Sequence, residues 1–135
     1  MRLMSFTDFG LRALMLLGTA PERARTSEDL ARALGISRHH LVKVLQHLAA
    51  AGYVRTVRGA GGGVRLARPA AAIRLGEAVA YLERGQPLVE CFRADGGACP
   101  LTPSCRLRAA LSRARAAFLE SLNGETLADC VTARA

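Results

Sequence analysis

The stretch DLARALGISRHHLVKVLQHLAAAGYV, residues 29–54, decides the fold of this 135-residue chain. It predicts a short helix, capped by Thr26 or Ser27, and then a turn at Gly35. A second helix is expected over residues 37–51. Two helices joined by a short glycine-containing turn form a helix-turn-helix, the motif that places its second helix in the major groove of DNA.

The second of these helices has two distinct faces. Leucine and valine at positions 41, 44, 45 and 48 share one side and are expected to enter the core. The opposite side offers donors to phosphates and base edges, and one apolar side chain for a thymine methyl group. A helix face that only contacts solvent would have a similar sequence. The flanking segments are therefore needed to distinguish a DNA-contacting face from a solvent-exposed one. The candidate DNA-contacting residues of this helix are Ser37, Arg38, His39, Val42, Lys43 and Gln46.

A basic hairpin is predicted directly after this helix. Residues 53–57 and 64–68 alternate as strands do, and the glycine-rich segment RGAGGG, residues 58–63, forms a tip between them. Such a hairpin is typical of the wing of a winged helix. A nucleotide-binding glycine loop is rejected, because Val64 stands where GxGxxG needs its third glycine and no helix follows. The candidate DNA-contacting residues of the wing are Arg58, Gly59 and Arg65.

The charge distribution favours the same function for the first half of the chain. Residues 1–68 carry a net charge of +7 and residues 69–135 a net charge of +1. A basic half suits a nucleic-acid partner. We therefore predict a mainly α protein with two regions, a winged helix-turn-helix domain over residues 1–70 and a second region over residues 71–135.

A helix is also expected to precede the helix-turn-helix, starting at Ser5 or Thr7. Asp8 and Arg12 are spaced for an i,i+4 ion pair on its surface. Its predicted buried face consists of Phe6, Phe9, Ala13, Leu16, Leu17 and Ala20.

The second region predicts a helix, a long loop and another helix. The first helix runs from Leu75 to about Gly85, and residues 86–103 form a loop without structure of its own. A long helix then begins at Ser104. Its apolar stripe predicts dimerisation, because a palindromic DNA site needs a two-fold symmetric protein. The stripe consists of Leu107, Leu111, Ala114, Phe118 and Leu122.

The long loop concentrates three of the four cysteines, Cys91, Cys99 and Cys105. No export signal or membrane-spanning segment is visible, so a reducing cytoplasm is expected and disulfides fit poorly. Structural zinc usually shows closely spaced cysteine pairs or a nearby histidine. An iron–sulfur cluster tolerates wide gaps in a flexible loop. Spacing alone places the cluster only slightly ahead of zinc.

Several motifs together make the chain resemble the NsrR/IscR family of bacterial winged-helix iron–sulfur regulators over essentially its whole length. Within that family the likeness is greatest to the nitric-oxide-sensing branch. The motifs are SFTDFGLRAL, DLARALGISRHHLVKVLQHLAAAGYV, RGAGGGVRLARP, IRLGEAV, VECF, CPLTPSCRLRAAL and TLADC.

The resemblance implies a homodimer with one [4Fe–4S] cluster per subunit, held by Cys91, Cys99 and Cys105, with a [2Fe–2S] cluster as the alternative. It also implies that Asp8 of the partner subunit completes the ligand set. Leu107 stands where the IscR branch has a histidine, and Arg12 stands where a related [2Fe–2S] redox sensor has one. Neither of those branches is therefore favoured, and Cys130 receives no ligand role.

The function expected from these features is repression of transcription from a palindromic operator, relieved by nitric oxide. A sensor of iron–sulfur status or redox state is the alternative within this class. A zinc-stabilised interaction module without a DNA role is the alternative from another class. We do not expect an enzyme, because the sequence shows no nucleophile–base pair and no signature of a substrate pocket.

Overall fold

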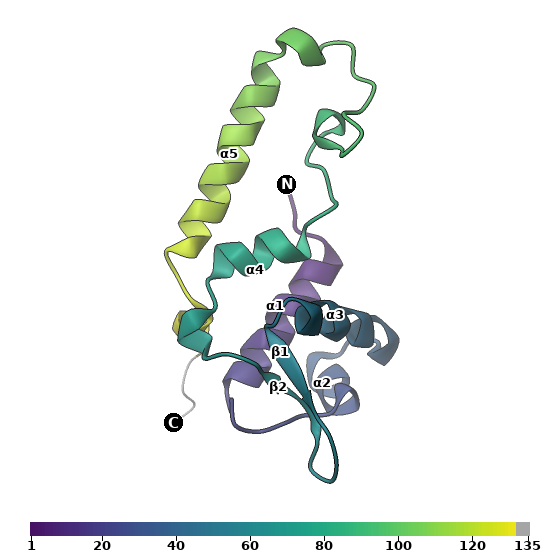
Figure 1. Cartoon of the computed structure of the whole chain (residues 1–135), viewed down its shortest axis with the longest axis vertical. Helices are drawn as coiled ribbons and strands as arrows, with labels where there is room; N and C mark the ends of the chain where they lie inside the picture. The colour runs from purple at the N-terminus through teal and green to yellow at the C-terminus, as the bar shows by residue number, and fades with distance from the viewer. Residues whose placement is uncertain (132–135) are drawn as a thin grey trace.

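The computed structural model describes residues 1–131 and confirms a mainly α architecture with one two-stranded wing (Figure 1). The wing lies at one end of the molecule, and a long helix extends from the other side of the body. The helices are α1 (Ser5–Gly18), α2 (Ser27–Leu34), α3 (Arg38–Ala50), α4 (Leu75–Leu82), α5 (Arg106–Asn123) and α6 (Leu127–Cys130). The strands are β1 (Val54–Val57) and β2 (Gly63–Leu66), and short 3-10 helices are η1 (Ala70–Ala72), η2 (Glu90–Phe92) and η3 (Thr102–Ser104).

The helix-turn-helix forms as the sequence predicts. The hydroxyl of Thr26 accepts a hydrogen bond from the N–H of Asp29 at 3.0 Å and caps α2. Gly35 ends α2 in the left-handed conformation, φ 66°, which glycine adopts without steric cost. Ser37 occupies the N-cap position of α3 but makes no side-chain capping bond. The predicted core residues of α3 are all buried: Leu41, Val44, Leu45 and Leu48.

The predicted buried face of α1 is partly wrong. Leu14 is fully buried although the periodicity does not predict it, whereas Phe6 and Phe9 are only half-buried. Thr7 is not a cap: it lies inside the helix, 0% exposed, and its hydroxyl has no partner among the described residues. The reason is that α1 packs against α3, α4 and α6 together, so more than one of its sides is covered.

The wing is an antiparallel hairpin in which Arg55 pairs with Arg65. A segment ahead of α2 adds to it, because Arg25 and Val64 exchange backbone hydrogen bonds of 2.9 and 2.8 Å. A Cβ atom at Gly63 would overlap the carbonyl oxygen of Arg25. The close approach therefore requires glycine there, and the base of the wing is tied to the helix-turn-helix.

Helices α4 and α5 form the second region and touch at one end of α5. Gly76 of α4 lies against the backbone of Leu119 in α5. The amide oxygen of Asn123 accepts the N–H of Glu77 at 2.9 Å, and the Arg74 guanidinium donates to the Asn123 carbonyl at 3.0 Å. The last residue of α5 thus caps the first turn of α4.

The predicted ends of two elements are corrected. Helix α4 stops at Leu82, three residues before the predicted end, and Gly85 beyond it has a left-handed φ of 79°. Helix α5 begins at Arg106 with Cys105 as its N-cap, two residues later than predicted.

Both regions share one hydrophobic core. Ile73, Leu82 and Leu127 from the second region belong to the same buried cluster as Leu14 and Leu41. The predicted boundary between residues 70 and 71 stays a prediction, and the last four residues of the second region lie outside the described residues. Within residues 1–131 no helix is both long and apolar enough to cross a membrane.

Candidate functional site

The outer face of α3 is available to a ligand along its whole length. Because Leu41, Val44 and Leu48 hold the inner face in the core, the helix presents its polar side chains outward. Of the residues predicted to contact DNA, Val42 is half-buried and the others are exposed: Ser37, Arg38, His39, Lys43 and Gln46.

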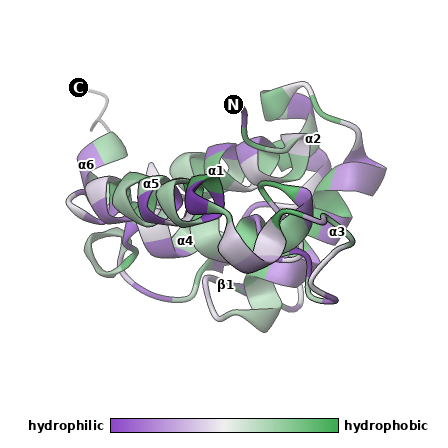
Figure 2. Ribbon diagram, turned by 90° about the horizontal axis from the view of Figure 1, so that it is seen from above, coloured by the Kyte–Doolittle hydropathy of each residue, from purple (hydrophilic) through white to green (hydrophobic). Residues whose placement is uncertain are grey.

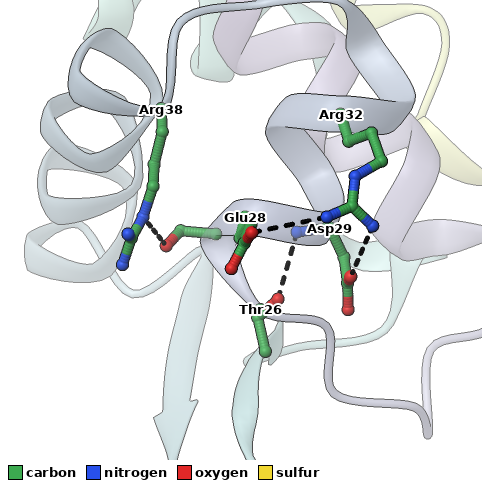
Figure 3. A network of polar contacts seen from close by, with 6 residues as sticks. Thr26, Glu28, Asp29, Arg32 and Arg38 are labelled. Atoms are coloured by element: carbon green, nitrogen blue, oxygen red, sulfur yellow. Dashed lines mark hydrogen bonds and ion pairs between the residues drawn. The ribbon is translucent and has the colours of Figure 1, made fainter.

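Arg38 is held at the junction of the two helices (Figure 3). Its Nε lies 3.4 Å from the hydroxyl of Ser27, in the first turn of α2. Arg32 instead pairs with Glu28 and Asp29 of its own helix, at 3.3 and 3.9 Å. The arrangement leaves the remaining nitrogens of Arg38 free to donate at the start of α3, where the helix-turn-helix geometry brings phosphates close.

The wing arginines have different roles. Arg58 and Gly59 lie at the exposed tip. Arg65 is half-buried, with Nη1 3.4 Å from the Glu22 carbonyl oxygen. Arg68 turns away from the tip, because it donates to the carbonyls that follow α3 and stacks over Tyr53, 4.2 Å from the ring centroid. Among these three arginines, Arg58 is therefore the one best placed to contact an external ligand.

Arg25 is a candidate that sequence reasoning missed. Its backbone pairs with Val64 of the wing, and its Nε is buried without a hydrogen-bond partner among residues 1–131. Because that nitrogen is enclosed, an external acceptor such as a phosphate could reach only the other nitrogens of this half-buried side chain. The sequence feature that could have identified Arg25 is the charged segment ERAR, residues 22–25. From sequence alone, this segment indicates only the end of the first helix.

Replacing Arg58 with alanine is expected to weaken DNA binding for all sequences alike, because a tip arginine contacts phosphates and reads no bases. The slope of log K against log salt should become shallower by about 0.9 for each phosphate that the protein no longer neutralises. Fluorescence anisotropy at several salt concentrations measures both. Arg113→Ala, an exposed arginine of α5, is the matched control. A slope in Arg58→Ala equal to that of the parent would show that the wing does not touch phosphate.

The cysteine loop, residues 83–105, is more ordered than predicted. Cys91 lies in η2, and Cys105 follows η3 directly. Between them Glu90 accepts the N–H of Ala98 at 3.4 Å, and Asp95 accepts the N–H of Gly97 at 2.9 Å. The prediction of a loop without structure is corrected, because two short 3-10 turns and these side-chain bonds shape it.

The surroundings of Cys105 suit a negatively charged ligand. The N–H of Arg108 donates to the Cys105 sulfur at 3.4 Å, and the helix N-terminus favours negative charge. The first turn of α5 has no acidic residue and carries Arg106 as well as Arg108. Three thiolates around iron form an anionic group that this positive field stabilises. The donor types therefore fit an iron–sulfur cluster.

The single chain does not gather these ligands into a cage. Cys91, Cys99 and Cys105 are free and half-buried. Within residues 1–131 no group of three or more histidine, cysteine, aspartate or glutamate side chains lies close enough to hold a metal ion. The predicted ligand set stays a prediction. Cys130 lies apart, and burial raises the pKa of its thiol, which disfavours the thiolate that metals bind.

Asp8 and Arg12 form the ion pair that their spacing predicts. Arg12 donates to both carboxylate oxygens of Asp8, through Nε at 2.9 Å and Nη2 at 2.7 Å. Both side chains are about half exposed, so the pair lies on the surface of α1. The carboxylate is thus accessible to another molecule, but it already has a partner within its own helix.

The profile of a known family matches residues 3–133, almost the entire chain. That family is Rrf2, described as iron-dependent transcriptional regulators. The chain belongs to the Rrf2 family. It is 46% identical over 136 residues to the HTH-type transcriptional regulator NsrR of Geobacillus kaustophilus, covering all of this chain and 92% of that protein.

Solved Rrf2-type structures share this architecture. CymR, the global cysteine regulator of B. subtilis, matches with a TM-score of 0.77 and 25% identity over 100% of this chain and 99% of that one. IscR of T. potens matches with a TM-score of 0.77 and 24% identity over 96% and 85%, a likeness that shows the fold alone. The chain is an NsrR-like transcriptional regulator, and relatives of this kind are not enzymes.

Proposed function

We propose that this Rrf2 protein is a homodimeric repressor that binds a palindromic operator and releases it in response to nitric oxide. Cys91, Cys99 and Cys105 would hold one [4Fe–4S] cluster per subunit, together with Asp8 of the partner subunit. When bound, the cluster would supply iron that reacts with nitric oxide. The observation that carries the proposal is the presence of three free thiols in the loop that ends at the arginine-rich start of α5, in a chain 46% identical to an NsrR.

The ion pair of α1 supports a reversible role for Asp8. In the chain as described, Arg12 satisfies both carboxylate oxygens. An exposed pair of this kind contributes only about 0–1 kcal/mol, so another cation can compete for the carboxylate. When the Asp8 carboxylate has no external partner, it therefore stays paired with Arg12.

The partly exposed apolar stripe of α5 supports the homodimer. No residue of α5 is buried, and Leu107 is 64% exposed. Hydrophobic and hydrophilic residues share this helix, as the view from above shows (Figure 2). A second copy covering the stripe would remove apolar surface from water and relate the two α3 helices by a two-fold axis. Those helices would then read half-sites about one DNA turn apart.

The decisive experiment is an anaerobic titration. Protein purified without oxygen is expected to contain iron and sulfide and to bind operator DNA. Adding nitric oxide should weaken that binding by at least about tenfold, which is well below the roughly 10³- to 10⁷-fold by which specific binding exceeds non-specific binding. Binding is followed by anisotropy and iron by colorimetric analysis. Nitric-oxide-treated Cys130→Ala protein should respond as the parent does.

Other outcomes separate the alternatives. An iron–sulfur protein whose DNA affinity changes with oxidation or cluster loss but not with nitric oxide would be a redox or cluster-status sensor. A colourless protein containing zinc would contradict both iron-based functions. The interaction module without a DNA role is not supported, because the relatives are transcriptional regulators.

A further inference from the structure

The last turn of α3 is held by a side chain from α4. The hydroxyl of Tyr81 donates a hydrogen bond to the carbonyl oxygen of His47 at 2.7 Å. The same oxygen accepts the N–H of Ala51 at 3.2 Å, which closes the end of the helix. Tyr81 therefore adds a second hydrogen bond to a carbonyl in the last turn of α3, and it does so from the element that leads into the cysteine loop.

Tyr81 also belongs to a continuous set of aromatic and cationic contacts. Its ring lies 6.0 Å from that of Tyr53, between centroids, and the Arg84 guanidinium lies over it at 4.0 Å. On the other side, Arg68 stacks over Tyr53 and donates to the Ala51 carbonyl at 3.1 Å. The contacts run from the base of the wing, past the end of α3, to the end of α4.

The cysteine loop begins at this set of contacts. Arg84 directly precedes Gly85 and donates its N–H to the Tyr81 carbonyl at 3.3 Å. Its neighbour Glu83 accepts the backbone N–H of Met4 at 2.8 Å, at the start of α1. A displacement of the first residues of the loop would therefore act on Tyr81 and on the beginning of α1 at once.

Helix α1 reaches the same point of α3 from another direction. Phe6 in its first turn lies edge-on to the ring of His47, with centroids 5.0 Å apart. Phe6 is two residues from Asp8, and Tyr81 is three residues from Arg84. Helix α1, which carries Asp8, and helix α4, which leads into the cysteine loop, thus both contact α3 at His47.

We propose that Tyr81 is the positioning residue that transmits the state of the cysteine loop to the recognition helix, through its hydrogen bond to the His47 carbonyl. This inference rests on the proposed function. The hydroxyl fixes the C-terminal end of α3 relative to α4, and so sets the tilt at which the outer face of α3 meets DNA. When the loop shifts, the Tyr81 ring follows Arg84, and the hydrogen bond transfers that movement to α3.

Tyr81→Phe tests the hydroxyl alone, because the ring and its stacking with Arg84 remain. The measured quantity is the ratio of DNA dissociation constants between metal-free and cluster-loaded protein. It is expected to fall about fivefold in the variant, the fold-change that a typical net hydrogen bond is worth. Tyr53→Phe is the matched control, since its hydroxyl makes no hydrogen bond to residues 1–131, and its ratio should stay within about twofold of the parent.

Hydrogen exchange of the metal-free protein provides an independent readout. In Tyr81→Phe the amides of residues 47–53 should exchange faster, while those of α1 and α6 stay as in the parent. Faster exchange everywhere would indicate a purely structural role and overturn the proposal. The proposal would also be overturned if the DNA affinity of the parent depends on the cluster and Tyr81→Phe has the same ratio of dissociation constants as the parent.

The two measurements distinguish a failure of the proposed function from a failure of this inference. A parent whose DNA affinity does not depend on the cluster would contradict the proposed function. The exchange of residues 47–53 would still decide whether Tyr81 holds the end of α3, because that measurement needs neither the cluster nor DNA.

Discussion

Cys99→Ala protein, purified without oxygen, is expected to contain less than about a tenth of the iron and sulfide of the parent, because a cluster held by few thiolates is lost with one of them. Cys99 is free, half-buried and central among the loop thiols in sequence. Its DNA binding should then no longer respond to nitric oxide. Iron and sulfide analysis, visible absorption and anisotropy measure the three consequences.

Cys130→Ala is the matched control for this prediction. Burial raises the pKa of Cys130, and the residue lies on α6, away from the cysteine loop. The control should keep the iron content and the nitric oxide response of the parent. Full iron content in Cys99→Ala, or loss of iron in Cys130→Ala, would contradict the predicted ligand set.

Gly76→Ala is expected to destabilise the protein, against the usual effect of this substitution. In an open helix position, alanine is favoured over glycine by about 1 kcal/mol. At residue 76 the new methyl group would overlap the Leu119 carbonyl and press on the Asn123 side chain, 2.5 Å away. Because backbone atoms cannot rotate aside, overpacking of about 1–3 kcal/mol outweighs the gain. The free energy of unfolding in urea should fall by up to about 2 kcal/mol.

Gly124→Ala provides the same chemical change just beyond the end of α5. Gly124 has a right-handed φ of −67°, and its nearest contact is the Ser121 carbonyl of the preceding turn at 3.2 Å. This control should change the free energy of unfolding by less than about 0.5 kcal/mol. A Gly76→Ala protein as stable as the parent would show that α4 and α5 do not pack as closely as described.

The helix-turn-helix could be predicted from sequence because its signals are local. The Thr26 cap and the turn at Gly35 depend on neighbouring residues, and the buried face of α3 follows helical periodicity. The wing could also be predicted from sequence, because two strand-like segments around a glycine-rich tip are typical of a hairpin. The exposure of the predicted DNA-contacting side chains of α3, except the half-buried Val42, follows from the same periodicity.

The remaining features depend on contacts distant in sequence. The buried side of α1 is decided by three helices, so its own periodicity misplaces Leu14 and Thr7. Arg68 looks like a wing residue in the sequence, but stacking on Tyr53 and the free carbonyls after α3 turn it inward. The proposed role of Asp8 as a fourth ligand cannot be predicted from periodicity either, because only the family resemblance distinguishes Asp8 from a member of an ordinary surface ion pair.

The one-sided attachment of α5 makes it a lever. Gly76, Asn123 and Arg74 fix its C-terminal end, whereas its N-terminal end carries Cys105. Its 18 residues span about 27 Å at the helical rise of 1.5 Å per residue. A rotation of about 5° at the fixed end would move the thiol by about 2.4 Å over that length. Metal–ligand distances tolerate only about 0.2 Å, so angular changes too small to disturb the core would be enough to make or break a bond between Cys105 and the proposed cluster.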